Sequence, residues 1–153
     1  MRISTLLFLV ICAGIPACAK ETSTADAERL AVADEMISAW NSMEWDRAFN
    51  LFADDGVLHS VMIEPIVGKA AIRERLLPLV NGLDRIELQV ANKGNVNDVV
   101  MFERVDDFVY KGKYSQIPVV GVMEISNGKI DVWREYYDKA SLTAALSSPD
   151  AED

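Results

Sequence analysis

The pattern of apolar residues changes its period once along the chain, at Asn81-Gly82. Before this point, apolar residues recur every three or four positions, as on one face of a helix. After it, segments rich in β-branched and aromatic residues are separated by short turn sequences, as in a series of hairpins. Helices followed by hairpins predict an α+β domain in which the helices pack on one face of a sheet.

Three helices and one strand are predicted before the change of period. The first helix begins at Asp26 and places Leu30, Met36 and Trp40 on one stripe. The other segments are a short helix over 45–52 ended by Asp54-Asp55-Gly56, a strand over 57–63, a turn at Glu64-Pro65 with Gly68, and a helix over 69–80.

Four strands and a last helix are predicted after the change of period. The strands occupy residues 85–92, 99–110, 114–125 and 129–137, and the helix occupies 139–146. Lys111-Gly112-Lys113 and Ser126-Asn127-Gly128 are the hairpin turns. Four long strands curl because sheets twist, and Gly112 and Gly121 permit bending. A curled sheet closed by helices is a cone with an interior, which is the default place for a ligand.

Residues 1–19 have the composition of an export signal peptide. Arg2 precedes an apolar run from Leu6 to Ile15, and small residues follow. This run is too short to cross a membrane together with its flanks. We therefore expect an exported protein, either periplasmic or secreted.

Two processing sites compete in this segment. Ala17-Cys18-Ala19 fits an A-x-A cleavage site and would give a soluble protein that starts at Lys20. Ile15-Pro16-Ala17-Cys18 resembles a bacterial lipobox. That alternative would end the signal at residue 17 and leave a lipid anchor at Cys18.

Cysteine chemistry is excluded from the mature fold. Both cysteines, Cys12 and Cys18, lie in the signal segment, so the domain has neither an internal disulfide nor a cysteine-ligated zinc site. About 134 residues remain, which is enough for one domain. That domain is predicted to span residues 29–146, after a flexible lead-in over 20–28 and before a disordered tail over 147–153.

The charge balance argues against polyanionic partners. The formal net charge is −9, and removal of Arg2 with the signal makes it −10. So acidic a domain is a poor binder of nucleic acid or of an anionic membrane surface. Apart from the lipid anchor considered at Cys18, we expect neither nucleic acid nor a membrane as a partner.

Two predicted strands place ionisable groups on an aromatic face, because alternate residues of a strand share a face. On one strand this face carries Phe102, Arg104, Asp106 and Phe108, and on the other Trp133, Glu135 and Tyr137 from the sequence WREYYD. Each segment alone is most simply a surface ion pair or an edge strand with one wet face. If both faces line one pocket, an arginine between two carboxylates satisfies three charges that are otherwise costly to bury.

The run from Phe102 to Asp138, FERVDDFVYKGKYSQIPVVGVMEISNGKIDVWREYYD, resembles the limonene-1,2-epoxide hydrolase family, within the broader SnoaL-like group. The resemblance covers roughly residues 33–146 and is densest in ERVDxF, GVxEI, NGKI and WREYYD. It implies a cystatin-like cone, also called nuclear-transport-factor-2-like. In such a cone, N-terminal helices pack on a strongly curved mixed sheet that encloses a pocket.

The resemblance also implies a triad of two carboxylates and an arginine. Arg104 and Asp106 match the family's ERxD segment, and Glu135 takes the place of the second Asp, in a WRDYFD segment. The implied reaction is a one-step hydrolysis without a metal or organic cofactor. Glu135 would be the general base toward a water, protonated Asp106 would donate to the leaving epoxide oxygen, and Arg104 would separate their protonation states. For this, we expect Arg104 to outweigh burial at Glu135 and keep it ionised.

The sequence departs from the family at three positions. Glu135 is one methylene longer than Asp, and Leu58 and Ser60 stand where the family has the Tyr and Asn that hold its water. Ser60 can still contact a water, whereas Leu58 cannot. His59, between them, is predicted to point to the other face of its strand and out of the pocket.

The implied partner is a small hydrophobic molecule. Its pocket is predicted to be lined by Leu58, Ser60, Met62, Phe102, Phe108, Trp133 and Tyr137. Two other functions stay open, a non-catalytic binding protein for a small apolar ligand and an isomerase or cyclase on the same cone. Donors that converge near Glu135 would favour hydrolysis, and a dry apolar pocket would favour binding. A homodimer is possible.

Overall fold

The computed structural model describes residues 23–147 of the chain. Helices come first, hairpins follow them and a helix ends the domain, in the predicted order. The elements are α1 (Thr24–Asn41), α2 (Trp45–Asn50), β1 (Phe52–Ser60), β2 (Ile66–Val67), α3 (Lys69–Val80), β3 (Leu83–Val96), β4 (Val99–Tyr110), β5 (Lys113–Ser126), β6 (Lys129–Tyr136) and α4 (Lys139–Leu146). The predicted signal segment, with both processing sites and Cys18, lies outside the described residues, as does the end of the tail.

One mixed sheet of six strands, in the order β2-β1-β6-β5-β4-β3, forms the scaffold. Strands β3 to β6 are joined as antiparallel neighbours, and β1 runs parallel to β6. The turns at Lys111-Gly112 and Asn127-Gly128 have positive φ at both residues. This is the type I′ pattern, whose twist matches that of the strands, and it confirms the two predicted hairpin turns.

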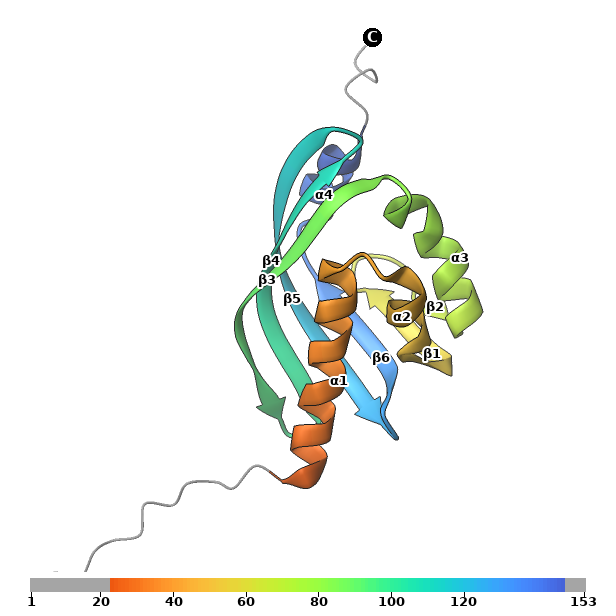
Figure 1. Ribbon diagram of the computed structural model, residues 1–153, viewed down its shortest axis with the longest axis vertical. Coiled ribbons are helices and arrows are strands. Elements are labelled where there is room, and N and C mark those ends of the chain that lie inside the picture. The colour runs from red at the N-terminus through yellow and green to blue at the C-terminus, as the bar shows by residue number, and fades with distance from the viewer. Residues whose placement is uncertain (1–22, 148–153) are drawn as a thin grey trace, which may run out of the picture.

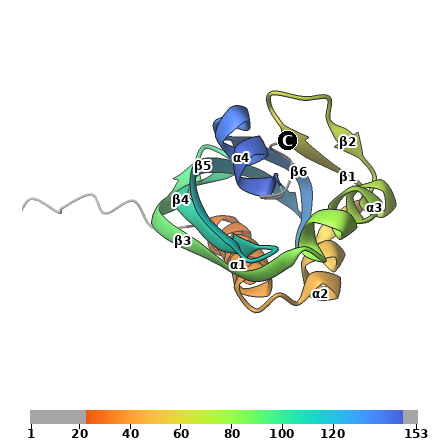
Figure 2. The ribbon, with the colours of Figure 1, turned by 90° about the horizontal axis from the view of Figure 1, so that it is seen from above.

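The sheet curls, and the helices lie on its concave side (Figures 1 and 2). Helix α1 packs against β3, β4 and β5, and α3 packs against β1 and β2. Helix α4 packs against β5 near the β4–β5 hairpin, where Lys113 Nζ donates to the carbonyl oxygen of Ala144 at 2.6 Å. The predicted fold class, α+β with helices on a strongly curved mixed sheet, is confirmed.

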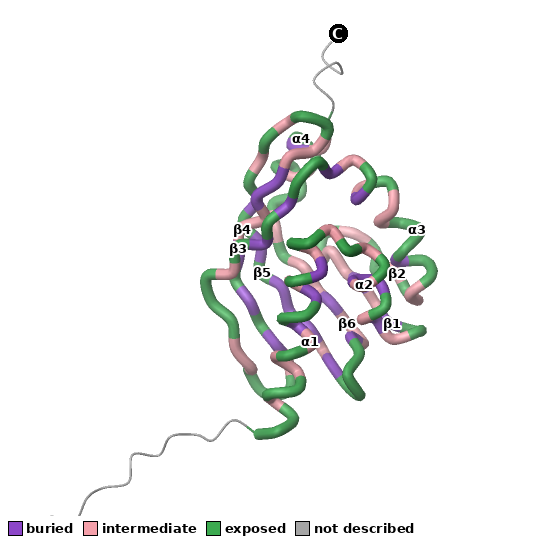
Figure 3. The backbone as a smooth tube through the Cα atoms, in the orientation of Figure 1, coloured by how far each residue is buried: buried purple, intermediate pink, exposed green. Residues whose placement is uncertain are grey.

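Buried residues, which are purple in Figure 3, form two clusters between the helices and the sheet. The first lies beneath α1, where Ala33, Met36 and Ala39 are fully buried. Two alanines on this stripe let the helix approach the sheet closely. The second cluster joins α3, α4 and the part of β3, β4 and β5 that lies toward them. Helices α1, α3 and α4 therefore enclose the charged face of β4 and β6 from the concave side of the sheet.

Helix α1 begins two residues earlier than predicted. The Ser23 side chain accepts a hydrogen bond from the backbone N–H of Asp26, which caps the helix. Arg29 pairs with Asp26 at 2.6 Å within the first turn. Residues 24–28, predicted as part of a flexible lead-in, are therefore helical, because a serine cap and an ion pair satisfy the free end of the helix.

Strand β1 includes Asp54-Asp55-Gly56, which the sequence predicts as the end of the preceding helix. An irregularity in the pairing with β6, between Phe52 and Val57, accommodates these residues. A Cβ atom on Gly56 would lie 3.0 Å from the carbonyl oxygens of Ala53 and Ile130. Gly56 therefore allows the backbone of β1 to lie close to the backbone at Ile130, and it does not end a helix.

Gly121 of β5 makes room for an aromatic ring. Phe102 of β4 is its strand partner, and a Cβ atom on Gly121 would clash with the Phe102 ring. On its other side Gly121 is paired with Glu135 of β6. The missing side chain therefore leaves room for the Phe102 ring over Gly121, beside the strand that carries Glu135.

We predict that Gly121→Ala lowers the free energy of unfolding by about 1–3 kcal/mol, because the added methyl group overpacks against the Phe102 ring. Gly94→Ala in β3 is the matched control, since a Cβ atom there meets no atom within 4 Å. We expect Gly94→Ala to lower the free energy of unfolding by less than about 0.5 kcal/mol. Urea denaturation measures both, and equal stability of the two variants would contradict the prediction.

Candidate active site

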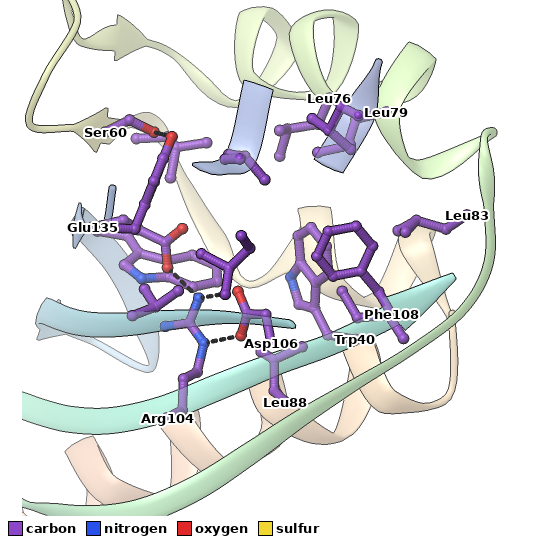
Figure 4. Close-up of a pocket in the computed structure, with 18 of the residues that line it drawn as sticks. Trp40, Ser60, Leu76, Leu79, Leu83, Leu88, Arg104, Asp106, Phe108 and Glu135 are labelled. Carbon is purple, nitrogen blue, oxygen red and sulfur yellow. Dashed lines mark hydrogen bonds and ion pairs between the residues drawn. The ribbon is translucent and has the colours of Figure 1, made fainter. Parts of the chain in front are cut away.

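Three charged side chains converge on the concave face of the sheet: Arg104 and Asp106 from β4 and Glu135 from β6 (Figure 4). Strand β5 lies between these two strands. Alternate residues of each strand face the same side, so Arg104 and Asp106 point together. The arginine side chain is long enough to extend over β5 and reach the carboxylate of the more distant strand.

Arg104 lies within hydrogen-bond distance of both carboxylates. Its Nε donates to Asp106 Oδ1 at 2.6 Å, and its Nη2 donates to Asp106 Oδ2 at 3.1 Å and to Glu135 Oε1 at 2.6 Å. Only 2% of the Arg104 side chain is exposed, compared with 18% for Asp106 and 17% for Glu135. The predicted geometry, one arginine between two carboxylates, is therefore what the structure contains.

Aromatic rings surround the guanidinium group. Arg104 Cζ lies 5.1 Å from the ring centroid of Phe102 and 5.8 Å from that of Trp133, within the range of cation–π attraction. Arg104 Nη1 is buried and has no hydrogen-bond partner among residues 23–147, and the same holds for Trp133 Nε1. The rings thus stabilise the part of the cation that faces no carboxylate. This explains why aromatic and charged residues alternate on both strands.

Burial raises the pKa of the Glu135 carboxyl group above its ordinary value. The Arg104 guanidinium opposes this rise, whereas the neighbouring Asp106 adds to it. The expectation that Arg104 outweighs burial at Glu135 is therefore wrong, because burial has the largest effect on the pKa of this carboxyl group and Asp106 adds to it.

Arg104 keeps its charge in this environment. Burial by itself lowers the pKa of the guanidinium, but the charges of Glu135 and Asp106 and their hydrogen bonds outweigh burial and raise that pKa above its ordinary value. The arginine is therefore a fixed positive charge, and any proton that moves in the cluster moves between carboxyl groups and ligands.

A cavity of about 240 Å³ opens beside the charged cluster. Asp106, Arg104 and Glu135 all lie in its wall. Five of the seven predicted lining residues are also there: Leu58, Ser60, Phe108, Trp133 and Tyr137. His59 does not line the cavity.

Met62 and Phe102, which the sequence predicts in the lining, do not line this cavity. Strand β1 ends at Ser60, so Met62 lies in the turn that follows and is 38% exposed. Phe102 faces the predicted side of β4, but it lies over Gly121 in the core beneath α1. Parity alone fails for both, because it shows neither where a strand stops nor which element covers its face.

Two hydroxyl groups lie in the cavity wall close to Glu135. The Tyr137 hydroxyl donates to Ser60 Oγ at 2.9 Å, and Ser60 is the strand partner of Glu135 in the β1–β6 pair (Figure 4). Ser60 keeps its own hydroxyl proton for donation, and the Tyr137 oxygen can still accept. The pair therefore offers a donor and an acceptor beside a carboxylate. Sequence reasoning placed both residues in the pocket but not their contact.

Helices supply lining residues that sequence reasoning did not assign to the pocket. These are Trp40 from α1, Arg75, Leu76 and Leu79 from α3, and Leu142 and Leu146 from α4. Figure 4 shows Leu76 and Leu79 across the cavity from Arg104. The apolar stripe of each helix predicts that such residues face inward, but the stripe is the same whether it meets the core or a cavity.

Asp107 belongs to a different cluster, on the other face of the sheet from Asp106. Its carboxylate accepts hydrogen bonds from Tyr114 at 2.8 Å, from Gln116 at 2.7 Å and from Arg85. These three partners lower the pKa of Asp107. Two adjacent acids thus have separate surroundings, and the carboxylate of Asp107 is fully occupied by structural hydrogen bonds.

Further ligating features are limited in the part of the chain that the structure describes. Between residues 23 and 147, no three His, Cys, Asp or Glu side chains come together in a way that could hold a metal ion. The helices in the same range are all too short or too polar to cross a membrane.

The chain is similar in sequence to known epoxide hydrolases. Residues 27–147 match the family described as the limonene-1,2-epoxide hydrolase catalytic domain. The epoxide hydrolase EphG of Mycobacterium tuberculosis is 26% identical over 113 residues, which are 74% of this chain and 75% of EphG.

Solved structures share the fold. A limonene-1,2-epoxide hydrolase-like epoxide hydrolase of M. tuberculosis has a TM-score of 0.69 and 23% identity, covering 79% of this chain and 90% of that chain. SalBIII, an epoxide hydrolase/cyclase-like enzyme in pyran ring formation in the polyether salinomycin, has a TM-score of 0.67 and 18% identity, covering 75% of this chain and 94% of that chain. At these identities the likeness shows the fold alone, and it confirms the predicted cone.

We predict that Arg104→Met lowers the free energy of unfolding by about 3–5 kcal/mol at neutral pH, because two buried carboxylates lose their cation. Without Arg104, the pKa of Glu135 rises further above its unfolded value. The native state then binds more protons than the unfolded state, so its stability falls as pH rises through that range. The loss should therefore be smaller at about pH 5 than at about pH 8, as measured by urea denaturation.

Arg134→Met, on the same strand as Glu135, is the matched control. Arg134 pairs with Glu124 at 2.6 Å, but the two side chains are 27% and 45% exposed. We expect a loss of no more than about 1 kcal/mol from this variant. An Arg104→Met protein whose loss is the same at both pH values would contradict the account of two dependent carboxylates.

Proposed function

The chain belongs to the limonene-1,2-epoxide hydrolase family, and we propose that it adds water to a small hydrophobic epoxide to give a diol. The observation that carries the proposal is one guanidinium group between two carboxylates in the wall of a largely apolar cavity. Opening an epoxide needs a base that activates water and an acid that protonates the ring oxygen. Two carboxyl groups in different protonation states can supply both.

Glu135 is the general base in this proposal, and Asp106 is the general acid. Glu135 lies beside the hydroxyl pair of Ser60 and Tyr137, which can hold a water against the carboxylate. Protonation of Asp106 releases one of its oxygens from Arg104 and lets that oxygen donate to the epoxide. Arg104 keeps both carboxyl groups in place and lowers the cost of the charge that remains on one of them.

The reaction balances without a cofactor. The water oxygen bonds to an epoxide carbon as the ring C–O bond breaks. One water proton passes to Glu135, and the proton of Asp106 passes to the ring oxygen, which becomes the second hydroxyl of the diol. One proton then returns from Glu135 to Asp106 before the next turnover. The carboxyl pair carries a single proton at the start and the end, so the cluster with Arg104 stays neutral.

The raised pKa of Glu135 fits this role. A base accepts a proton more readily when its pKa lies closer to the working pH. Burial therefore makes Glu135 a stronger base than an exposed glutamate, while Arg104 limits the rise. The raised pKa also narrows the pH range in which the enzyme is active, because Glu135 is protonated and cannot act as a base below that pKa.

A second reaction can use the same groups. If a hydroxyl of the substrate takes the position of the water, the same base and acid close a ring instead of forming a diol. The observation that favours this reading is the largely apolar lining, in which Ser60 and Tyr137 are bonded to each other. The mass of the product separates the two reactions, since a diol gains the mass of water and a cyclic ether keeps the mass of its substrate.

We predict that Glu135→Gln lowers epoxide turnover by at least about 100-fold, because Gln keeps the shape and the bond to Arg104 but cannot accept a proton. Glu135→Asp, the family's side chain, should retain activity or raise it. In the parent protein, activity should fall as pH falls through the raised pKa of Glu135, since the protonated carboxyl group is no longer a base. Initial rates on a panel of small hydrophobic epoxides measure all three.

Glu124→Gln is the control for this series. Glu124 lies on β5 and pairs with Arg134 away from the cavity, so the epoxide turnover of the Glu124→Gln variant should equal that of the parent protein. Turnover by Glu135→Gln at the parent rate would mean that Glu135 is only a structural partner of Arg104. A parent protein that binds epoxides and converts none of them would support the binding-protein alternative.

We predict that Tyr137→Phe slows hydrolysis by about three- to tenfold, which is the effect of one lost hydrogen bond on the group that fixes the water. Tyr136→Phe is the matched control, because Tyr136 is exposed and does not line the cavity. Rates of the two variants on the same epoxide give the answer. If both run at the parent rate, the Tyr137 hydroxyl does not belong to the water site.

A further inference from the structure

Arg75 is an arginine without an acidic partner. It is exposed on α3, and no carboxylate of residues 23–147 lies within ion-pair distance of it. Every other arginine in that range has such a partner: Arg29, Arg47, Arg73, Arg85, Arg104 and Arg134. Lys111, Lys113, Lys129 and Lys139 in the same range also have no acidic partner, so the place of Arg75 in the fold is what distinguishes it.

The local sequence keeps Arg75 free of partners within its helix. Side chains three or four positions apart are neighbours on a helix, and for Arg75 these are Ala71, Ile72, Pro78 and Leu79. None of them is acidic. Arg73, two positions away, faces elsewhere and pairs with Asp46 at 2.6 Å.

Arg75 also lines the cavity that contains the charged cluster. Its neighbours in the wall on α3 are Leu76 and Leu79, which lie across the cavity from Arg104 (Figure 4). An exposed residue that also lines a cavity lies where the cavity meets solvent. Arg104 is the only other cation among the described lining residues, and two carboxylates already neutralise it. With two arginines and two carboxyl groups, the wall has no excess charge when both acids are ionised. Arg75 is the one charged group among these described lining residues without an opposite partner, and it lies at the opening.

We propose that Arg75 binds a carboxylate of the substrate, so that the preferred substrate is an epoxide with an apolar body and a terminal carboxylate. This rests on the proposed function, since it names the substrate class of the same cavity. A planar guanidinium group matches a carboxylate with two parallel hydrogen bonds. One cation suits a monoanion better than a phosphate, which usually takes several donors.

The size of the cavity agrees with such a ligand. A dry apolar cavity of about 150 Å³ holds a benzene molecule, and this cavity measures about 240 Å³. It therefore accepts an apolar body somewhat larger than one six-membered ring. A carboxylate on that body can remain at the opening, hydrated on one side and bonded to Arg75 on the other, so it avoids the cost of burial.

The kinetic test compares an alkanoic acid that carries an epoxide at the end remote from its carboxylate with the methyl ester of the same acid. Arg75→Gln should raise KM for the acid by about three- to tenfold and lower the ratio of acid to ester in kcat/KM, because an exposed charge pair contributes modestly. Arg73→Gln makes the same charge change on the same helix, outside the cavity, and should leave the ratio unchanged. Added salt should reduce the preference for the acid in the parent.

A binding test separates this proposal from the proposed reaction. Octanoic acid and methyl octanoate, which have no epoxide, can be titrated against the fluorescence of Trp40 and Trp133 in the cavity wall. Weaker binding of the acid to Arg75→Gln than to Arg73→Gln supports the carboxylate site even if no epoxide is converted. Equal weakening in both variants would show general charge attraction, and no weakening in Arg75→Gln would show no carboxylate site, so either result overturns the proposal.

Discussion

Burial of the Arg104 guanidinium is the interaction on which the rest of the site depends. A charge removed from water is costly unless it is paired and bonded. Here Asp106 accepts hydrogen bonds from two nitrogens of Arg104, and Glu135, on another strand, accepts one from one of the same nitrogens. The rings of Phe102 and Trp133 lie against the guanidinium group. No single strand could supply all of these groups. The curved sheet is therefore needed to bring β4 and β6 to a common centre across β5.

The same arrangement changes the acidity of Glu135. Glu135 is largely buried in the cavity wall, which raises its pKa, while the Arg104 guanidinium opposes this rise. The hydroxyl groups of Ser60 and Tyr137 make the cavity wall polar beside this carboxylate. The leucines of α3 and α4 make the facing wall apolar.

Strand parity predicts that Arg104 and Asp106 share one face of β4 and that Glu135 lies between two aromatic rings on one face of β6, because the period of two is a property of the backbone. That the three residues form one triad is implied by the family resemblance. The parity prediction fails for Met62, because the residue at which β1 ends depends on how β1 pairs with β6. In that pairing, the Val61 N–H donates to the carbonyl oxygen of Glu135 at 3.0 Å. The parity prediction also fails for Phe102, whose position depends on α1 and Gly121. The helix order and hairpin turns follow from local sequence, whereas the lining from α1, α3 and α4 and the pKa of Glu135 depend on contacts between distant elements.

A single turnover in water enriched in heavy oxygen tests the central claim, that Glu135 acts as a base toward water and not as a nucleophile. Enzyme in excess over a neutral epoxide allows each molecule to react once. The account predicts that the diol of this first turnover carries the heavy oxygen and that the carboxyl groups of Glu135 and Asp106 carry none. A first-turnover diol with ordinary oxygen, together with heavy oxygen in either carboxyl group, would show a covalent intermediate and contradict the account.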